Sequence, residues 1–358
     1  MNFSQSHISE KIGAVRTKLS DYFSDIENQR LEDLRVTQVI QRPFSTIRYL
    51  EVQTSTSRKR LVMKSINHHP INMAIIERDN QALVEYNILC QLYPKFEAIE
   101  YCSVPRPILV IPEIETYLME FVEGDLLIDR LRLVRHFSSR RRFAELQRHF
   151  FDVGRWLRYF QKFTGVSEEG SESLQPVIER FESRLDLIER SEHFGDEKKK
   201  RLMETARDLL DQTAKDLLGL RIPVSGCHTD FHPLNVLVSD KGVTVIDFMG
   251  YRRGCVALDV LKTLVLLEDE MSSLFASAYR VGILKERFLE GYGVMLSIPL
   301  PALILCEAME RILSIAGSIT TTKRFSRIHH RLEERLRIKK LIKWLEGSRE
   351  NTLLWPTR

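Results

Sequence analysis

The stretch CHTDFHPLNVLVSDKGVTVIDFMG, residues 227–250, combines polar side chains with two short apolar runs. The runs NVLVS and VTVIDF are rich in β-branched residues, and the intervening SDKG has turn chemistry, so the stretch predicts a β-hairpin. Asp230, Asn235 and Asp247 flank these runs. Strands in these places would hold two carboxylates and an amide at a cleft and keep them out of the core.

The spacing of the polar residues indicates a chemistry. Asp230 precedes Asn235 by five positions, and Asp247 closes the next strand. Protein kinases carry a catalytic aspartate, an asparagine and a metal-binding aspartate in this order. Phosphoryl transfer needs an acceptor that orients a hydroxyl group, and oxygen ligands that hold Mg²⁺ against the phosphates. Asp230 suits the first role, and Asn235 and Asp247 suit the second.

HTDFHPLN, residues 228–235, resembles the HxDxHxxN catalytic loop of the aminoglycoside phosphotransferase/choline kinase-like family, and VIDF, residues 245–248, resembles its metal-binding strand end. The resemblance implies an α+β, bilobal, protein-kinase-like fold. It also implies ATP- and Mg²⁺-dependent transfer of the γ-phosphate to a hydroxyl of a small molecule. His228 would orient the catalytic loop, and Asp259, in ALDVLKTL, would brace it.

The same resemblance extends upstream. Lys64 ends the alternating run RLVMK, where the family has a lysine that reaches the α/β-phosphates and pairs with a glutamate on a helix. Glu77 and Glu85 are both candidates for this glutamate. We prefer Glu85, because LVEYNILCQL is the strongest helical pattern in this region.

Two further segments concern the nucleotide. TYLMEFVEGDLL, residues 116–127, resembles the family's connector between lobes, and adenine would bond to backbone groups near Glu120 and Val122. The candidate phosphate loop, residues 41–52, contains no glycine, so Ser45 and Thr46 would supply hydroxyl and N–H groups. This departure keeps open an alternative from another class, a pseudokinase that serves as a binding or interaction module without turnover.

The pattern of apolar residues predicts three regions. Residues 1–35 have helical spacing and predict an N-terminal helical extension. Residues 36–122 contain several strand patterns and one main helix, and predict a β-rich, nucleotide-binding N-lobe. Residues 123–358 are mostly helical apart from the hairpin, and predict a C-lobe with the catalytic loop, the metal site and the acceptor pocket.

Composition excludes several classes of protein. The formal net charge is only +4, without the concentrated basic face that nucleic-acid binding calls for. The five cysteines are scattered without CxxC spacing, which argues against zinc and for reduced thiols. No signal peptide is recognisable at the N-terminus, and no run approaches the ~18 apolar residues of a membrane span, so we expect a cytoplasmic protein.

The acceptor is the least determined part. Residues 130–143 and 323–347 are basic, and the plain interpretation is a solvated helix face in the first and a packed amphipathic helix in the second. The alternatives are an anionic or lipid-linked acceptor, and peripheral contact with an anionic membrane. The second segment would pack through its apolar residues, Phe325, Ile328, Leu332, Leu336 and Leu345.

A sugar, an amino alcohol or a glycan precursor fits the family resemblance as acceptor, and the sequence does not distinguish ATP from GTP. A protein kinase is a second alternative. It is disfavoured because no APE-like activation segment follows Asp247.

Overall fold

The chain divides into two compact units in the computed structural model. Unit 1 comprises Met1–Leu126 and Asn235–Met249, and unit 2 comprises Leu127–Leu234 and Gly250–Arg358. The sequence predicted contiguous lobes, whereas the structure groups the hairpin with unit 1. The structure describes residues 3–67, 80–135, 139–190, 196–271, 278–293, 298–321 and 328–347.

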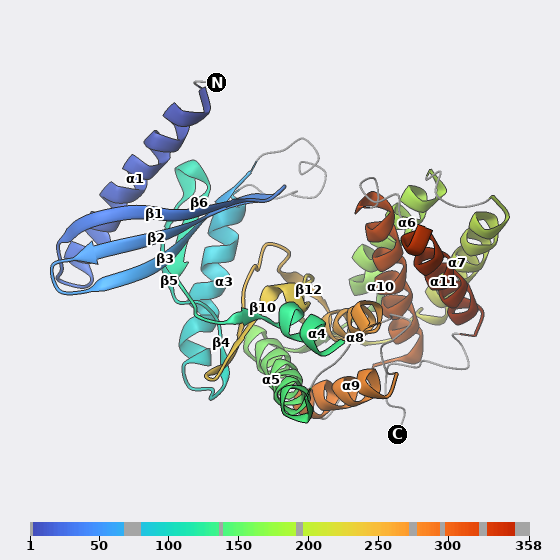
Figure 1. The fold of residues 1–358 in the computed structure, drawn as a ribbon. Coiled ribbons are helices and arrows are strands. Elements are labelled where there is room, and N and C mark those ends of the chain that lie inside the picture. The colour runs from blue at the N-terminus through green and yellow to red at the C-terminus, as the bar shows by residue number, and fades with distance from the viewer. Residues whose placement is uncertain are drawn as a thin grey trace. The chain divides into compact units, whose positions relative to one another are not determined.

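Unit 1 is built on a five-stranded antiparallel sheet with the order β1-β2-β3-β6-β5 (Figure 1). Neighbours along the chain pair through short turns, and β5 and β6 are joined by the 3-10 helix Pro112–Ile114. The strands are β1 Leu31–Gln41, β2 Ser45–Thr54, β3 Arg58–Ile66, β5 Pro107–Ile111 and β6 Thr116–Glu120.

Two helices pack on this sheet. α1, Phe3–Asp25, buries Val15, Leu19 and Phe23 in a core cluster with Met63 of β3. Successive side chains of a strand point to opposite faces. Lys64 therefore faces away from α1, and its side chain bonds to α3, Gln81–Phe96. The side chain of Asn80 caps α3 by accepting from the Leu83 N–H.

The predicted helical extension over residues 1–35 is too long. The helix ends at Asp25, and β1 already begins at Leu31. Leu31 pairs with Thr54 of β2, and Leu31 and Leu34 pack against the cluster under α1. The long β2 partner and this apolar surface override the helical spacing of the segment.

The predicted hairpin is confirmed. β10, Val236–Ser239, pairs antiparallel with β11, Gly242–Val245. Two short strands extend it: β4, Cys102–Ser103, runs parallel to β11, and β7, Asp125–Leu126, pairs with β10. Gly242 has φ +110°, and a Cβ there would lie 2.2 Å from the Tyr101 carbonyl oxygen, so the turn requires glycine.

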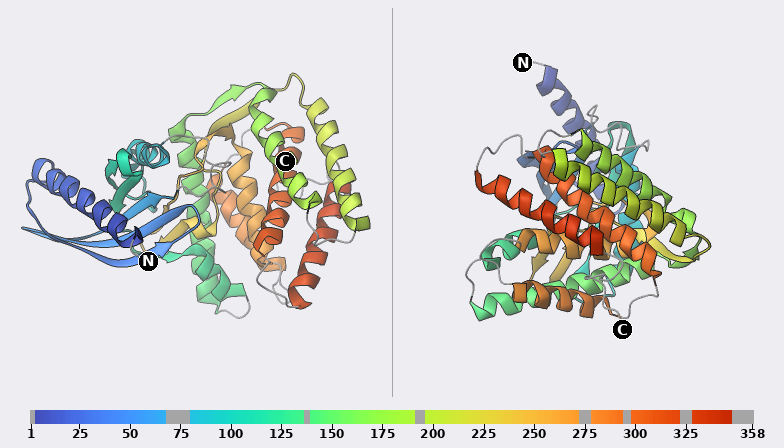
Figure 2. Two further views of the ribbon diagram at one scale, coloured as in Figure 1. Left: turned by 90° about the horizontal axis from the view of Figure 1, so that it is seen from above. Right: turned by 90° about the vertical axis from the view of Figure 1, so that its right-hand side faces the viewer.

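Unit 2 is mostly helical. The long helices α5 and α9 pack together, and Gly154 allows their close approach, because a Cβ there would lie 2.0 Å from the Phe288 carbonyl oxygen. α6, α7, α10 and α11 lie side by side (Figure 2). The helices are α4 Leu127–Arg135, α5 Arg140–Thr164, α6 Gln175–Glu189, α7 Asp196–Asp216, α8 Ala257–Met271, α9 Ala278–Tyr292, α10 Leu300–Thr321 and α11 Ile328–Gly347.

Unit 2 also contains a small sheet with the order β12-β9-β8. Both neighbouring pairs are antiparallel. Its central strand β9 leads directly into the HTDFHPLN stretch. The strands are β8 Ser167–Glu169, β9 Ile222–Cys227 and β12 Arg252–Cys255, and short 3-10 helices cover Ser171–Leu174 and Pro233–Asn235.

The two basic segments lie mostly on helices. In α11, Leu341, Ile342 and Leu345 are buried, and the Trp344 ring lies under the Arg311 guanidinium. Of the other predicted packing residues, Phe325 and the side chains of Ile328, Leu332 and Leu336 lie outside what the structure describes. In α4, Leu127, Ile128, Leu131 and Val134 are buried, whereas Arg130 and Leu133 are exposed. These observations favour the plain interpretations, a solvated helix face for the first segment and a packed amphipathic helix for the second.

The α+β class predicted from the sequence is confirmed by these two units. No helix in the described part of the chain combines the length and apolar character that crossing a membrane requires.

Candidate active site

The predicted site residues form two groups, one in each unit. The group in unit 1 is centred on Lys64 of β3, whose ammonium donates to both carboxylate oxygens of Glu85 in α3, at 2.9 and 2.8 Å. It also donates to Oδ1 of Asp247, which follows β11, at 2.7 Å. Glu77, the other candidate partner, lies outside the described residues. Three segments distant in sequence thus meet at one ammonium group.

Burial and charge set the ionisation of this group. The Lys64 and Glu85 side chains are 3% and 0% exposed, whereas Asp247 is 27% exposed. Burial by itself lowers the pKa of Lys64, but the Asp247 and Glu85 carboxylates raise it, and the net pKa lies above the ordinary value. The Tyr117 hydroxyl donates to Glu85 at 2.9 Å. Lys64 is therefore a fixed cation.

Asn235 and Asp247 lie at the same end of the hairpin, because the Ile246 N–H donates to the Asn235 carbonyl oxygen at 3.0 Å. Asp247 has a left-handed backbone with φ 71°, an uncommon conformation that concentrates at functional sites. Amide and carboxylate oxygens are the ligand types that Mg²⁺ takes alongside waters and substrate phosphates. The donor set fits magnesium. Within the described residues there is no group of three or more His, Cys, Asp or Glu side chains that could hold a metal ion without further ligands.

The group in unit 2 lies on the loop after β9. Thr229 has φ 61°, which is strained for a β-branched residue. Asp259, in the first turn of α8, accepts from the backbone N–H of His228 at 2.7 Å and of Thr229 at 2.8 Å. The Thr229 hydroxyl donates to the Gly250 carbonyl oxygen at 2.8 Å. These bonds offset the strain and hold the loop in one conformation.

Both carboxylate oxygens of Asp230 are engaged. Oδ1 lies 3.1 Å from the Lys262 ammonium, and Oδ2 lies 3.1 Å from His232 Nε2. Nδ1 of His232 accepts from the Leu234 N–H at 3.2 Å, so the ring proton resides on Nε2 and is donated to Asp230. The Asp230 side chain is nevertheless 50% exposed. The carboxylate is therefore accessible from solvent.

The two aspartates of this group have opposite pKa shifts. Burial alone raises the pKa of Asp230, but the His232 hydrogen bond and the Lys262 charge lower it more, so the net pKa lies well below the ordinary value. Burial raises the pKa of Asp259 to about 6, against the two backbone N–H bonds that lower it. Asp230 is thus an ionised hydrogen-bond acceptor rather than a strong base.

The core of unit 2 anchors the loop. The buried ring of Phe231 stacks on Trp156 of α5, with centroids 5.5 Å apart. Thr164, at the end of α5, accepts from the Gly226 N–H of β9 at 3.1 Å through its hydroxyl. Strand β9 therefore enters the loop at a fixed position.

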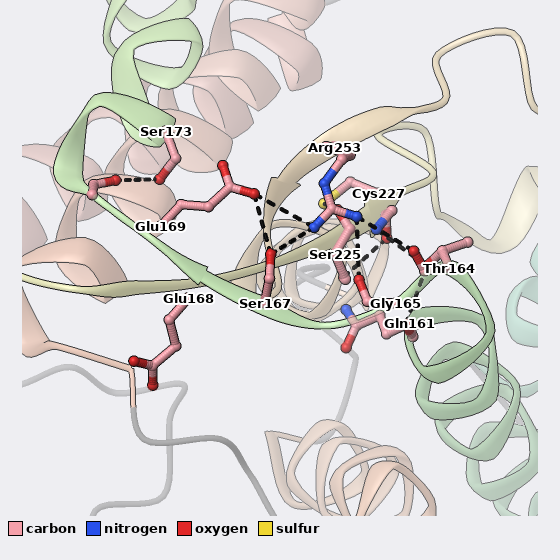
Figure 3. A network of polar contacts seen from close by, with 12 residues as sticks. Gln161, Thr164, Gly165, Ser167, Glu168, Glu169, Ser173, Ser225, Cys227 and Arg253 are labelled. Carbon is pink, nitrogen blue, oxygen red and sulfur yellow. Dashed lines mark hydrogen bonds and ion pairs between the residues drawn. The ribbon is translucent and has the colours of Figure 1, made fainter.

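Arg253 of β12 adds a network around this strand (Figure 3). Its guanidinium donates to the hydroxyl of Ser167 at 2.8 Å and to the carbonyl oxygens of Thr164 and Gly165. A contact to Glu169 completes it at 3.4 Å. Because these side chains are partly exposed, the network contributes more to local geometry than to stability.

Ser45 and Thr46 lie at the start of β2, directly after the turn at residues 42–44. Both are buried, and the Thr46 hydroxyl donates to Asn67 at 3.0 Å. Both residues thus lie at the end of an interior strand, paired with β3 on one side. A phosphate contact by these hydroxyls would require rearrangement of that bond.

Two backbone N–H groups of the predicted connector between lobes already donate hydrogen bonds to neighbouring strands or loops. The Glu120 N–H donates to the Arg106 carbonyl oxygen at 2.9 Å, and the Phe121 N–H donates to Arg60 at 3.0 Å. The Val122 N–H has no hydrogen-bond partner among the described residues. Of the two predicted adenine contacts, Val122 is the one whose donor is available.

Sequence reasoning missed Lys262 and Tyr117. Lys262 follows Asp259 by three positions in the quoted ALDVLKTL, so helical spacing already placed the two on one face. Tyr117 lies in the quoted TYLMEFV run, and its pairing with Lys64 across β3 and β6 is visible only in the register. For neither residue does the residue type alone indicate that it belongs to the candidate site.

Comparison with known proteins identifies the class. The model of the phosphotransferase enzyme family matches residues 52–295, and the chain belongs to that family. This confirms the predicted resemblance and the assignment to the transferases and kinases. A search of curated protein sequences found no significant match.

Solved structures show the same fold. A glucosamine kinase in complex with glucosamine, ADP and inorganic phosphate has a TM-score of 0.60 at 14% identity, over 89% of this chain and 84% of that chain. An amicoumacin kinase in complex with AMP-PNP, Ca²⁺ and Ami has a TM-score of 0.56 at 15% identity, over 92% of this chain and 92% of that chain. A choline kinase from Cryptosporidium parvum has a TM-score of 0.50 at 12% identity, over 90% of this chain and 92% of that chain. The predicted kinase-like fold is confirmed.

Proposed function

We propose that this protein is an ATP- and Mg²⁺-dependent kinase that transfers the γ-phosphate to a hydroxyl of a small molecule. Membership of the phosphotransferase enzyme family supports the reaction class. The similar structures include a glucosamine kinase, an amicoumacin kinase and a choline kinase, which favours a sugar, an amino sugar or an amino alcohol as acceptor.

The observation that carries the proposal is the placement of Lys64. A lysine used only for stability would need one buried carboxylate, yet Lys64 joins the fully buried Glu85 to the partly exposed Asp247. This presents a fixed cation and a carboxylate oxygen side by side. Those are the two groups that bind nucleotide phosphates and their magnesium ion.

Each group has its own part in the proposed reaction. In unit 1, Lys64 neutralises phosphate charge, and Asn235 and Asp247 hold magnesium, which would screen the charge that develops on the phosphate oxygens. In unit 2, Asp230 accepts a hydrogen bond from the acceptor hydroxyl and orients it for attack. The covalent chain joins the groups, because Asp230 and Asn235 are five positions apart.

A pseudokinase is the second candidate, and the buried Ser45 and Thr46 favour it. A phosphate loop without glycine whose Thr46 hydroxyl is already bonded offers the phosphates fewer donors. In this case Mg·ATP would bind without turnover.

The decisive experiment is a transfer screen. Purified protein is incubated with γ-labelled ATP, Mg²⁺ and a panel of sugars, amino sugars, amino alcohols and glycan precursors, and phosphorylated product is counted. We expect Asp230→Asn to lower transfer by about 10²- to 10⁴-fold. Asp240→Asn, the same change at the exposed hairpin turn, is the matched control and should leave transfer intact.

The outcomes separate the candidates. Transfer to a small molecule that depends on Asp230 supports the proposal. Binding of Mg·ATP in a thermal-shift titration without any transfer supports the pseudokinase. Labelling of generic protein substrates, with none of the small molecules, would point to a protein kinase and contradict the proposal.

A further inference from the structure

The catalytic loop has a second brace besides Asp259. The Lys262 ammonium donates to the Thr229 carbonyl oxygen at 2.7 Å and to Asp230 Oδ1 at 3.1 Å. The Lys262 side chain is 6% exposed, although it belongs to a residue type that is almost never buried without a partner. Asp259 and Lys262 lie one turn apart on α8. Asp259 thus binds the N–H of the strained Thr229, and Lys262 binds its carbonyl oxygen.

We propose that Lys262 is a positioning residue for the transfer reaction, holding the Asp230 carboxylate ionised and in one orientation through its bridge to the Thr229 carbonyl oxygen. This inference rests on the proposed function, because it concerns the residue that would orient the acceptor hydroxyl.

The geometry explains why one orientation results. Lys262 fixes Oδ1 of Asp230, and His232 Nε2 fixes Oδ2, so rotation of the carboxylate would break both contacts. A carboxylate keeps lone pairs on each oxygen after accepting one hydrogen bond. The acceptor hydroxyl can therefore bond to an Asp230 oxygen that is already held in place.

Other charged groups surround Lys262 and Asp230. Glu310 of α10, which is buried, and Asp259 of α8 bring negative charge, whereas Arg180 of α6 and Arg252 of β12 bring positive charge. Lys262 and His232 lie within hydrogen-bond distance of the Asp230 carboxylate. The low pKa of Asp230 agrees with this arrangement.

Replacement of Lys262 has a specific consequence. Lys262→Met keeps a long side chain on α8 but removes the charge and both hydrogen bonds, whereas Lys262→Arg keeps a cation. Without the ammonium, burial favours the protonated form of Asp230, and a protonated carboxyl presents a donor where the acceptor hydroxyl needs an acceptor. A lysine on α8 that only packed against its neighbours, without its charge beside Asp230, would leave the ionisation of Asp230 unchanged on replacement.

The test follows the Asp230 carboxyl directly. The full-length protein is labelled with ¹³C at the aspartate side-chain carboxyl, and the signal of Asp230, assigned by its loss in Asp230→Asn, is titrated. In the wild type it should stay ionised through about pH 4, the ordinary range of an aspartate. In Lys262→Met the midpoint should rise by about 1 to 3 pH units. Lys262→Arg should stay near the wild type, and Lys339→Met, at an exposed lysine of α11, should match it.

Activity supplies the second readout. The acid limb of kcat/KM for transfer should move up by the same interval in Lys262→Met and be restored in Lys262→Arg, with the KM for ATP unchanged. An Asp230 midpoint that is the same in wild type and Lys262→Met overturns the inference. If Lys262→Met does not fold, a wild-type Asp230 that titrates at or above about pH 4 overturns it equally.

Failure of the proposed function looks different. If the wild type transfers phosphate to none of the acceptors, the kinase proposal falls, while the carboxyl titration still reports on Lys262. If transfer occurs but the titrations coincide, only the role of Lys262 falls.

Discussion

Glu85→Gln is the sharpest test of the buried group in unit 1. The variant keeps the size of the side chain and replaces one carboxylate oxygen with an amide NH₂. Glu85 accepts three hydrogen bonds, two from Lys64 at 2.9 and 2.8 Å and one from the Tyr117 hydroxyl at 2.9 Å. In the variant, the NH₂ faces one of these donors, so at least one bond is lost at a fully buried side chain.

The magnitude follows from the remaining partner. Leaving a buried charge without its counter-ion costs about 3–5 kcal/mol. Lys64 keeps Asp247 at 2.7 Å, so we expect the lower end, about 3 kcal/mol, or roughly a 100-fold larger opening equilibrium. The cost should be local to β3 and α3, which this contact joins.

The assay must report on unit 1. Trp156 and Trp344, the tryptophans among the described residues, belong to unit 2, so tryptophan fluorescence would report on the wrong unit. Hydrogen exchange read by mass spectrometry on peptides from residues 58–66 and 81–96 reports opening where the contact lies.

Glu113→Gln, at an exposed glutamate of the same unit, is the matched control and should leave exchange unchanged. The double variant Lys64→Met/Glu85→Met removes both charges and should be less destabilised than Glu85→Gln, because no ammonium is left facing an amide. Exchange of both peptides in Glu85→Gln within about threefold of the wild type, less than 1 kcal/mol, would refute the reasoning.

Two further predictions concern pH and metal. The pKa of Asp259 is raised to about 6 in the folded protein from an ordinary 3.8. Between these two pH values the folded state therefore binds more protons than the unfolded chain. The free energy of unfolding should fall by about 3 kcal/mol as pH rises through this window and stay level above it. Asp259→Asn should remove this slope in urea unfolding followed by tryptophan fluorescence, and parallel pH profiles of wild type and variant would contradict the assignment. Asp247→Ala should abolish the additional thermal stabilisation that Mg²⁺ gives to the ATP complex, and an undiminished shift would show that Asp247 is not a metal ligand.

Much of the fold was accessible from the sequence because its signals are local. The alternation of β3, the turn chemistry at residues 239–242 and the helical spacing of α3 each depend on neighbours within a few positions. The HTDFHPLN stretch was recognisable for the same reason, since covalent spacing places its polar groups on one short loop. The family and the kinase-like fold followed from it.

The local signal failed where a distant partner decided the structure. Residues 31–35 have helical spacing, yet they form a strand because β2 is long enough to pair with them and because Leu31 and Leu34 bury against the cluster under α1. The hairpin at residues 235–249 belongs to unit 1 although most of its sequence neighbours belong to unit 2.

The sequence by itself determined which residue types are present for phosphate chemistry and their order along the chain. Only the tertiary structure decided which charges meet: Lys64 lies 183 positions from Asp247, and Lys262 lies 32 positions from Asp230. A buried charge is tolerated only beside a partner, and nothing in its own neighbourhood along the chain states which segment will supply that partner. Packing of the strands and helices makes that choice.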